Sequence, residues 1–102
     1  MAAITITKEN FEREVTKSDK TVLLDFWAGW CMPCRMMSPT IEKVSDERPD
    51  IKVGKVNVDE QPELARRFAV AGIPSLVVLR QGKVVSQTTG ARPKNQVLAL
   101  LD

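Results

Sequence analysis

The sequence predicts an α/β fold in which a mixed five-stranded sheet is flanked by four helices. Three observations carry this prediction. Strand-length apolar or alternating segments recur along the chain, and helical segments lie between them in the order βαβαβαββα. Helical crossovers predict parallel strands, whereas the last two strands follow each other directly and predict an antiparallel edge. The length of 102 residues, without a linker or repeat, predicts one domain over residues 1–102.

The first three elements end at the most apolar part of the chain. A strand is predicted over residues 4–7, where isoleucine and threonine alternate. A helix is predicted over residues 9–16, with Thr7 or Asn10 as its cap. After a turn, residues 22–27 are almost wholly apolar, as expected for a central strand covered on both faces. The residues of the first helix that should face the core are Phe11 and Val15.

The middle of the chain predicts a helix, a strand and a second helix. Residues 35–47 form a helical pattern that Pro39 should kink. Residues 51–58 resemble another buried strand. Pro62 is a good first residue for a short helix that runs to residue 68. The core stripe of the long helix consists of Met37, Ile41 and Val44.

The last third predicts a hairpin and a closing helix. Two strands, over residues 75–80 and 83–88, are joined through Gln81-Gly82, which is a hairpin signal. Residues 94–101 form an amphipathic helix that carries Val97 and three leucines.

The composition excludes several classes of partner. Fifteen basic and thirteen acidic residues leave a net charge of +2, which is too even for nucleic acid or an anionic membrane as the main partner. No segment approaches the roughly 20 apolar residues of a membrane span. The first seven residues lack the features of a signal peptide, which predicts a cytoplasmic protein, although the processed form of an exported protein would look the same.

The two cysteines of the chain, Cys31 and Cys34, are separated by only Met32 and Pro33. A bond between them closes a very short loop, so it removes little entropy from the unfolded chain. In a reducing cytosol a structural disulfide is disfavoured, whereas a catalytic one is the usual exception. A C-x-x-C pair near a βαβ pattern is a known signal for thiol–disulfide chemistry.

A wider set of motifs resembles the thioredoxin family over essentially the whole chain. Residues 25–34, Asp-Phe-Trp-Ala-Gly-Trp-Cys-Met-Pro-Cys, are similar to the family's active-site segment. Pro39 matches its helix-kinking proline, and residues 57–59 match the end of its third strand. The resemblance extends to the cis-proline loop, Gly72-Ile-Pro-Ser75, and to glycines at positions 82 and 90. It implies a thioredoxin fold and a protein-disulfide reductase that works through a reversible Cys31–Cys34 disulfide.

The site chemistry then assigns four roles. Cys31 follows a strand and should occupy a helix N-terminus, where unpaired N–H groups stabilise its thiolate, so it is the predicted nucleophile. Cys31 should also be exposed, whereas Cys34 should be shielded and resolves the mixed disulfide. Asp25, within an apolar strand, is the predicted proton acceptor and donor, the alternative being a carboxylate that faces solvent at a strand edge. Lys55 matches a family lysine and is a candidate modulator of Asp25.

A client-binding surface is predicted around the reactive sulfur. Ile73-Pro74 resembles the cis-proline loop, whose backbone would pair with an extended client segment. An ordinary turn residue is the alternative for Gly90, and Trp27 is expected in the core. A flat apolar surface is predicted from Trp30, Met32, Pro33, Ile73, Gly90 and Ala91.

Two positions depart from the family pattern. Thioredoxins usually carry Gly where this chain has Met32 and Lys where it has Arg35. Arg35 keeps the charge. Met32 places a flexible apolar side chain beside the reactive sulfur, so it either tunes the redox potential and client contact or is a neutral replacement.

The resemblance implies thioredoxin reductase as electron donor, disulfide-containing proteins as clients, and a monomer without nucleic-acid or membrane partners. No cofactor or metal is expected, since two cysteines without histidine give a zinc site only between two chains. Two alternatives remain: a non-catalytic interaction subunit, which would need neither the cysteine pair nor Asp25, and an envelope disulfide oxidase or isomerase, which would need export.

Overall fold

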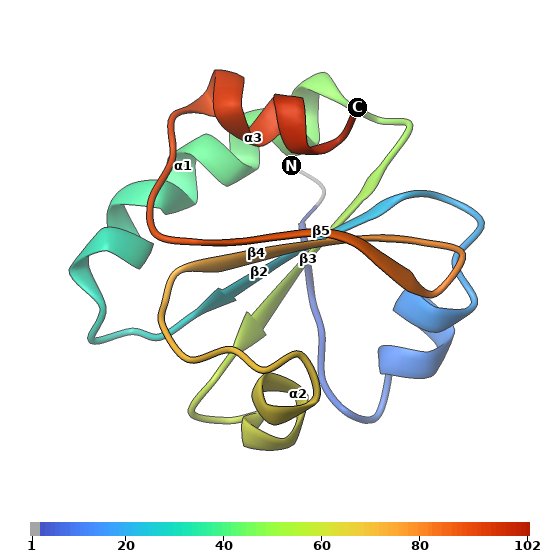
Figure 1. Ribbon diagram of the computed structural model, residues 1–102, viewed down its shortest axis with the longest axis horizontal. Helices are drawn as coiled ribbons and strands as arrows, with labels where there is room; N and C mark the ends of the chain where they lie inside the picture. Colours follow the sequence, from blue (N-terminus) through green and yellow to red (C-terminus); the bar gives the residue numbers. More distant parts are fainter. Residues whose placement is uncertain (1–2) are drawn as a thin grey trace.

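The computed structural model describes residues 3–102 and confirms the predicted α/β fold. The prediction of no signal peptide concerned residues 1–7, of which Met1 and Ala2 lie outside the described residues. Five strands form one sheet in the order β1-β3-β2-β4-β5. β1 and β2 run parallel to β3, whereas β4 runs antiparallel to both β2 and β5 (Figure 1). The strands are β1 (Ile4–Thr5), β2 (Val22–Trp27), β3 (Lys52–Asn57), β4 (Ser75–Arg80) and β5 (Lys83–Thr89).

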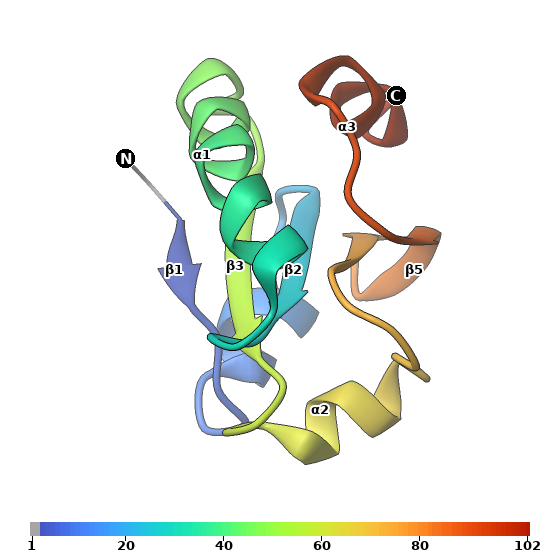
Figure 2. The same ribbon diagram turned by 90° about the vertical axis from the view of Figure 1, so that its left-hand side faces the viewer.

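Helices cover both faces of the sheet. Figure 2 shows α1 and α3 on one face and α2 on the other, and η1 packs on the same face as α2. None of the helices in the described part of the chain combines the length and apolar character that a bilayer span requires. Within residues 3–102 the helices are η1 (Glu12–Thr16), α1 (Met32–Glu47), α2 (Pro62–Arg67) and α3 (Lys94–Leu100).

Two apolar cores result, one on each face, and β2 contributes to both. Successive side chains of a strand point to opposite faces. Leu24 therefore packs with the η1 and α2 side chains, whereas Leu23 packs with those of α1 and α3. Asp25 shares the face of Leu23, so its carboxyl group points beneath α1. The apolar run of β2 follows from this double burial.

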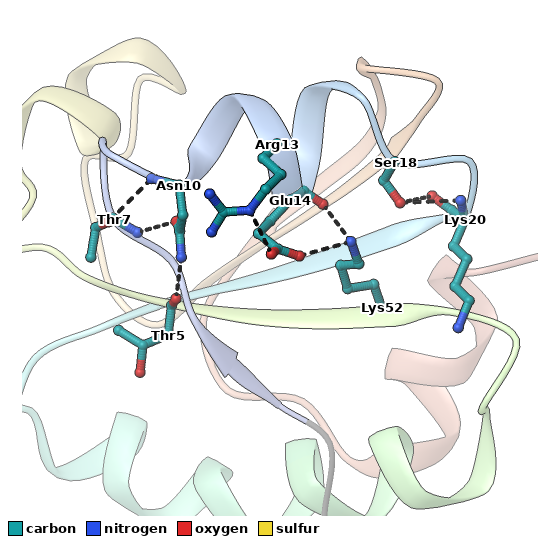
Figure 3. A network of polar contacts seen from close by, with 8 residues as sticks. All are labelled: Thr5, Thr7, Asn10, Arg13, Glu14, Ser18, Lys20 and Lys52. Atoms are coloured by element: carbon teal, nitrogen blue, oxygen red, sulfur yellow. Dashed lines mark hydrogen bonds and ion pairs between the residues drawn. The ribbon is translucent and has the colours of Figure 1, made fainter.

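The first helix differs from its prediction. It begins at Glu12 rather than at residue 9, and it is wound as a π-helix, in which the Lys17 N–H donates to the Glu12 carbonyl at 2.9 Å. Neither predicted cap residue caps it. Figure 3 shows the reason: Asn10 accepts a hydrogen bond from the Thr7 N–H at 2.8 Å and donates to the Thr5 carbonyl at 2.9 Å. These bonds hold a turn where the helix was expected to begin.

The same helix is tied to the sheet by an ion pair. Lys52 on β3 donates to the Glu14 carboxylate and to the Glu14 carbonyl, both at 3.0 Å (Figure 3). The Lys52 partner lowers the pKa of Glu14. As predicted, the core-facing residues of this helix, Phe11 and Val15, are buried.

The long helix α1 begins at Met32, three residues earlier than predicted. The missing turn contains Pro33, which has no N–H to donate and therefore suits a first helical turn. Pro39 lies inside the helix, as predicted, and its predicted core stripe of Met37, Ile41 and Val44 is buried.

The remaining boundaries lie within two residues of the prediction. Gln61 occupies the N-cap position of α2, and Pro62 is its first residue. The β4–β5 hairpin turns through Gln81 and Gly82, whose φ angles are 52° and 77°. Two positive φ angles are the geometry that a two-residue turn between twisted strands requires.

Gly54 in β3 lies where the backbone approaches the side chain of Ile6, directly after β1, and that of Leu24 in β2. A Cβ atom there would lie 2.5 Å from Ile6 Cγ1 and 3.0 Å from Leu24 Cδ2. Because the strands on both sides hold these side chains in place, Gly54→Ala should overpack the core and lower the free energy of unfolding by about 1–3 kcal/mol. Urea unfolding of the variant measures this. Gly29→Ala is the matched control, since nothing lies within 4 Å of the added atom. Equal effects of the two changes would contradict the clash.

Candidate active site

The two cysteines lie where β2 gives way to α1, and they form a disulfide with Cα atoms 5.3 Å apart. Cys31 is the N-cap residue of α1, and its sulfur accepts a hydrogen bond from the Cys34 N–H at 3.3 Å. The first N–H groups of a helix have no intrahelical partner. The sulfur of Cys31 therefore occupies the one end of α1 at which negative charge is stabilised.

The exposure of Cys31 corrects the sequence prediction. We expected an exposed Cys31 and a shielded Cys34, but in the disulfide form Cys31 is 5% exposed and Cys34 is 3% exposed. The cause is a small apolar cluster in which both cysteines pack with Ala28, and against which Trp27 and Ile73 lie. The two sulfurs therefore differ in their position on the helix and hardly at all in solvent contact.

Asp25 is buried, so the alternative of a carboxylate facing solvent is wrong. Its side chain lies in β2 and is 1% exposed, and its Oδ1 atom has no hydrogen-bond partner among residues 3–102. Burial disfavours the charged form and raises the pKa of Asp25 to about 6, while the positive charge of Lys55 acts in the opposite direction. A carboxyl group with this pKa exchanges protons close to neutral pH.

Lys55 is the direct neighbour of Asp25 on β3. Its ammonium group donates to Ser38 Oγ at 3.0 Å and lies 5.3 Å from the centre of the Trp27 ring. Lys55 is thus held between the sheet and α1 by a hydrogen bond and by the aromatic ring. Trp27 is half-buried and packs against the apolar cluster that contains the two cysteines, in agreement with its predicted place in the core.

The predicted client surface surrounds the disulfide, but it is not flat. Trp30 is 72% exposed and Met32 is 60% exposed, whereas Ile73 is half-buried. A hollow of about 200 Å³ lies between Trp30 and Ile73. Pro33 and Ala91 are exposed, and Gly90 is half-buried. The hollow is completed by Val58, Ala65, Val70, Ala71 and Gly72.

The loop that faces the cysteines has the predicted cis bond between Ile73 and Pro74. The Pro74 carbonyl accepts a hydrogen bond from the Gly90 N–H at 2.8 Å, which joins this loop to the end of β5. Gly90 has a φ of 102°, a conformation that other residues rarely adopt. The backbone therefore requires glycine here, which accounts for Gly90 without a client contact. Across residues 3–102, no three side chains of the metal-ligating types Cys, His, Asp and Glu converge.

Comparison with known proteins decides the family. The family model for thioredoxin matches residues 2–102. Thioredoxin of Alicyclobacillus acidocaldarius is 44% identical over 101 residues, which cover 98% of this chain and 95% of that protein. Thioredoxin of Chlorobaculum thiosulfatiphilum is 43% identical over 97 residues, 94% of this chain and 90% of the relative. Thioredoxin of Mycobacterium tuberculosis is 43% identical over 98 residues, 95% and 84% of the two chains.

The chain belongs to the thioredoxin family. Thioredoxins are oxidoreductases that reduce protein disulfides, and this member holds a disulfide between the two cysteines of its C-x-x-C motif. It is therefore a thiol–disulfide oxidoreductase of the protein-disulfide reductase type.

Several residues of this thioredoxin site escaped sequence reasoning. Asp59 accepts a hydrogen bond from the Trp30 indole N–H at 2.9 Å and so orients the exposed ring. Ser38 anchors Lys55, and Val58 lines the hollow beside Trp30. Val58 and Asp59 belong to the family motif of residues 57–59, which was the only signal that pointed to any of these residues.

Proposed function

We propose that Cys31 is the attacking sulfur of this thioredoxin. The observation that carries the proposal is its place as N-cap of α1, with the Cys34 N–H directed at its sulfur. In the reduced protein the Cys31 thiolate attacks a client disulfide; a bond forms between Cys31 and one client sulfur, and the other client sulfur leaves as a thiolate. The low exposure of Cys31 requires the client to reach into the rim of the site.

Cys34 then resolves the mixed disulfide. Its thiol gives its proton to the Asp25 carboxylate, and the resulting thiolate attacks the Cys31 sulfur. The Cys31–Cys34 disulfide forms, and the second client sulfur leaves, so the client has gained two electrons. Burial supports the assignment of Asp25, since a carboxyl group with a pKa of about 6 both accepts and returns a proton near neutrality. Lys55 modulates Asp25 by limiting that rise in its pKa.

The client binds along the cis-proline loop in this proposal. The Ile73 N–H has no hydrogen-bond partner among residues 3–102, so it is free to pair with an extended client segment. Backbone pairing gives affinity with little sequence preference. Pro74 sets the direction of the loop, and apolar contact comes from Trp30, Met32, Pro33, Ile73 and Ala91, with Gly90 closing the surface.

A thioredoxin reductase completes the cycle in this proposal by returning two electrons to the Cys31–Cys34 disulfide. We further propose that the protein is a monomer and acts in the cytoplasm. The test is reduction of insulin disulfides with a thioredoxin reductase as electron donor. We expect turnover by the parent and none by the variant in which both cysteines are serine. A parent protein that leaves insulin oxidised would instead favour an interaction subunit.

Met32 should influence the redox potential. Its side chain projects at the rim, where it is 60% exposed, and in the chain it directly follows Cys31 and lies two residues before Cys34. One contact of about 1.4 kcal/mol corresponds to about 30 mV for a two-electron couple, so Met32→Gly should shift the reduction potential by up to roughly that amount. Equilibration with a glutathione buffer measures the shift, and Met32→Ala separates loss of the side chain from the added freedom of glycine. Unchanged potentials and client rates in both variants would mark Met32 as a neutral replacement.

A further inference from the structure

A second hollow, of about 270 Å³, lies beside α1 and shares no lining residue with the one beside Trp30. The first hollow is lined by residues of α2 and of the connection from α2 to β4, whereas this one lies between α1 and the connection from β5 to α3. Its walls are Met36, Met37 and Thr40 on α1, and Ala91, Arg92 and Pro93 on the connection.

This groove begins at the rim of the active site. Met36 lies one helical turn beyond Met32 and two residues beyond Cys34. On the other wall, Ala91 follows Gly90, whose N–H is bonded to the Pro74 carbonyl. A client segment that lies along the cis-proline loop with its disulfide at Cys31 therefore passes the mouth of the groove.

Among the described residues that line the groove, Arg92 alone carries a charge, and its guanidinium group makes few hydrogen bonds. Its Nε atom is shielded from solvent and has no hydrogen-bond partner among residues 3–102. Its Nη2 group donates to the Thr89 carbonyl at 3.4 Å, and no carboxylate of the described residues pairs with it. A guanidinium group has five N–H donors, so most of the donors of Arg92 have no protein partner among residues 3–102.

The chemistry of the walls selects a carboxylate as the missing partner. The planar fork of a guanidinium matches the two oxygens of a carboxylate, and the pair forms two parallel charge-assisted hydrogen bonds. None of the described residues that line the groove is acidic. Met36, 72% exposed, offers an adaptable apolar wall for the stem of a longer side chain, and the Thr40 hydroxyl is a further donor.

We propose that this groove binds an acidic side chain of the client, an Asp or Glu close to the client's reactive cysteine, and that Arg92 is the residue that selects it. The inference rests on the proposed function and adds a substrate class to it. Backbone pairing at Ile73 accepts many client sequences, whereas the groove favours those clients that carry an acidic side chain near the reactive cysteine.

The test uses pairs of peptides that each contain one disulfide and differ only in Glu or Gln, placed two or three residues to either side of the reactive cysteine. The ratio of kcat/KM for the Glu and Gln peptides is measured for the parent at low and high salt. We expect a ratio of about five at the best position, the size of a favourable surface ion pair, falling towards one at high salt.

Three variants assign that ratio to one side chain. Arg92→Gln should bring the ratio to one, and Arg92→Lys should restore part of it, because lysine keeps the charge without the fork. Arg35→Gln is the matched control: Arg35 is an exposed arginine on α1 outside the groove, and this change should leave the ratio intact. Because both peptides are measured with the same variant, a general loss of activity lowers both values of kcat/KM equally and leaves their ratio unchanged.

The outcomes separate the two proposals. Equal rates for Glu and Gln peptides at every position, or an equal loss of preference in Arg92→Gln and Arg35→Gln, would overturn the acidic subsite while the reductase function stands. Failure to reduce either peptide would overturn the proposed function and this inference with it.

Discussion

Replacing Cys34 with serine should turn the protein from a catalyst into a trap. The Cys31 thiolate of this variant still attacks the client, but no second sulfur is present to release it, so mixed disulfides accumulate. Insulin turnover should fall to less than roughly 1/1000 of the parent rate, as expected when an essential reacting group is removed. Mass spectrometry of the captured complexes identifies the clients and the bonded cysteine.

Cys31→Ser is the matched control for this trap. It should lose turnover to the same extent and yet capture almost no client, because Cys34 lies within the helix and does not occupy its N-cap. The two cysteines are almost equally buried, so solvent exposure cannot explain a difference between them. Equal capture by both variants would contradict the assignment of Cys31 as the attacking sulfur.

Asp25→Asn should slow the release of clients and at the same time stabilise the fold. With no carboxylate to accept the Cys34 proton, we expect resolution of the mixed disulfide to slow by roughly 10-fold to 100-fold near pH 7. The parent rate should rise with pH around 6, where Asp25 ionises, and the variant should lack this inflection. Rapid-mixing measurements on a preformed mixed disulfide isolate this step.

The effect of Asp25 on stability follows from its raised pKa. Between pH 3.8, where an ordinary Asp titrates, and about 6, the folded protein holds a proton that the unfolded chain has lost. Stability therefore declines as pH rises through this window and stays low above it. The loss amounts to about 3 kcal/mol, which Asp25→Asn should recover at pH 7 but not at pH 4.

Urea unfolding at these two pH values measures the difference. Asp19→Asn is the matched control: Asp19 is exposed in a turn and this variant keeps Asp25, so its stability should decline from pH 4 to pH 7 as that of the parent does. Unchanged turnover together with lower stability of Asp25→Asn would make Asp25 a structural residue.

The sequence predicted those features that depend on the residues of a single segment, such as the limits of β2 and the burial of Asp25. The apolar run of β2 is bounded by polar residues, and its predicted limits agree with the structure. The burial of Asp25 follows from its apolar neighbours on the same strand. Glu12–Thr16 was predicted as a helix, but its late start and wide winding depend on the side-chain bonds of Asn10, which periodicity does not reveal.

The other features that were not predicted from the sequence arise where distant segments meet. The low exposure of Cys31 depends on Ile73, more than forty residues further along the chain. The hollow beside Trp30 forms where the connection from α2 to β4 approaches β3. These are tertiary contacts. Neither a motif nor a residue spacing in the sequence predicts how deeply Cys31 is buried or how the hollow is shaped.

The central position of β2 has a consequence for how clients are chosen. This strand is hydrogen-bonded on both sides, by β3 and β4, and it leads directly into the reactive cysteines. Strands of this kind belong to the parts of a protein that open last in local unfolding. A site fixed to such a strand does not reshape itself to reach a hidden disulfide, so the conformational work falls on the client. Disulfides in segments that fray easily will be reduced first, and discrimination among clients becomes a matter of their own local stability.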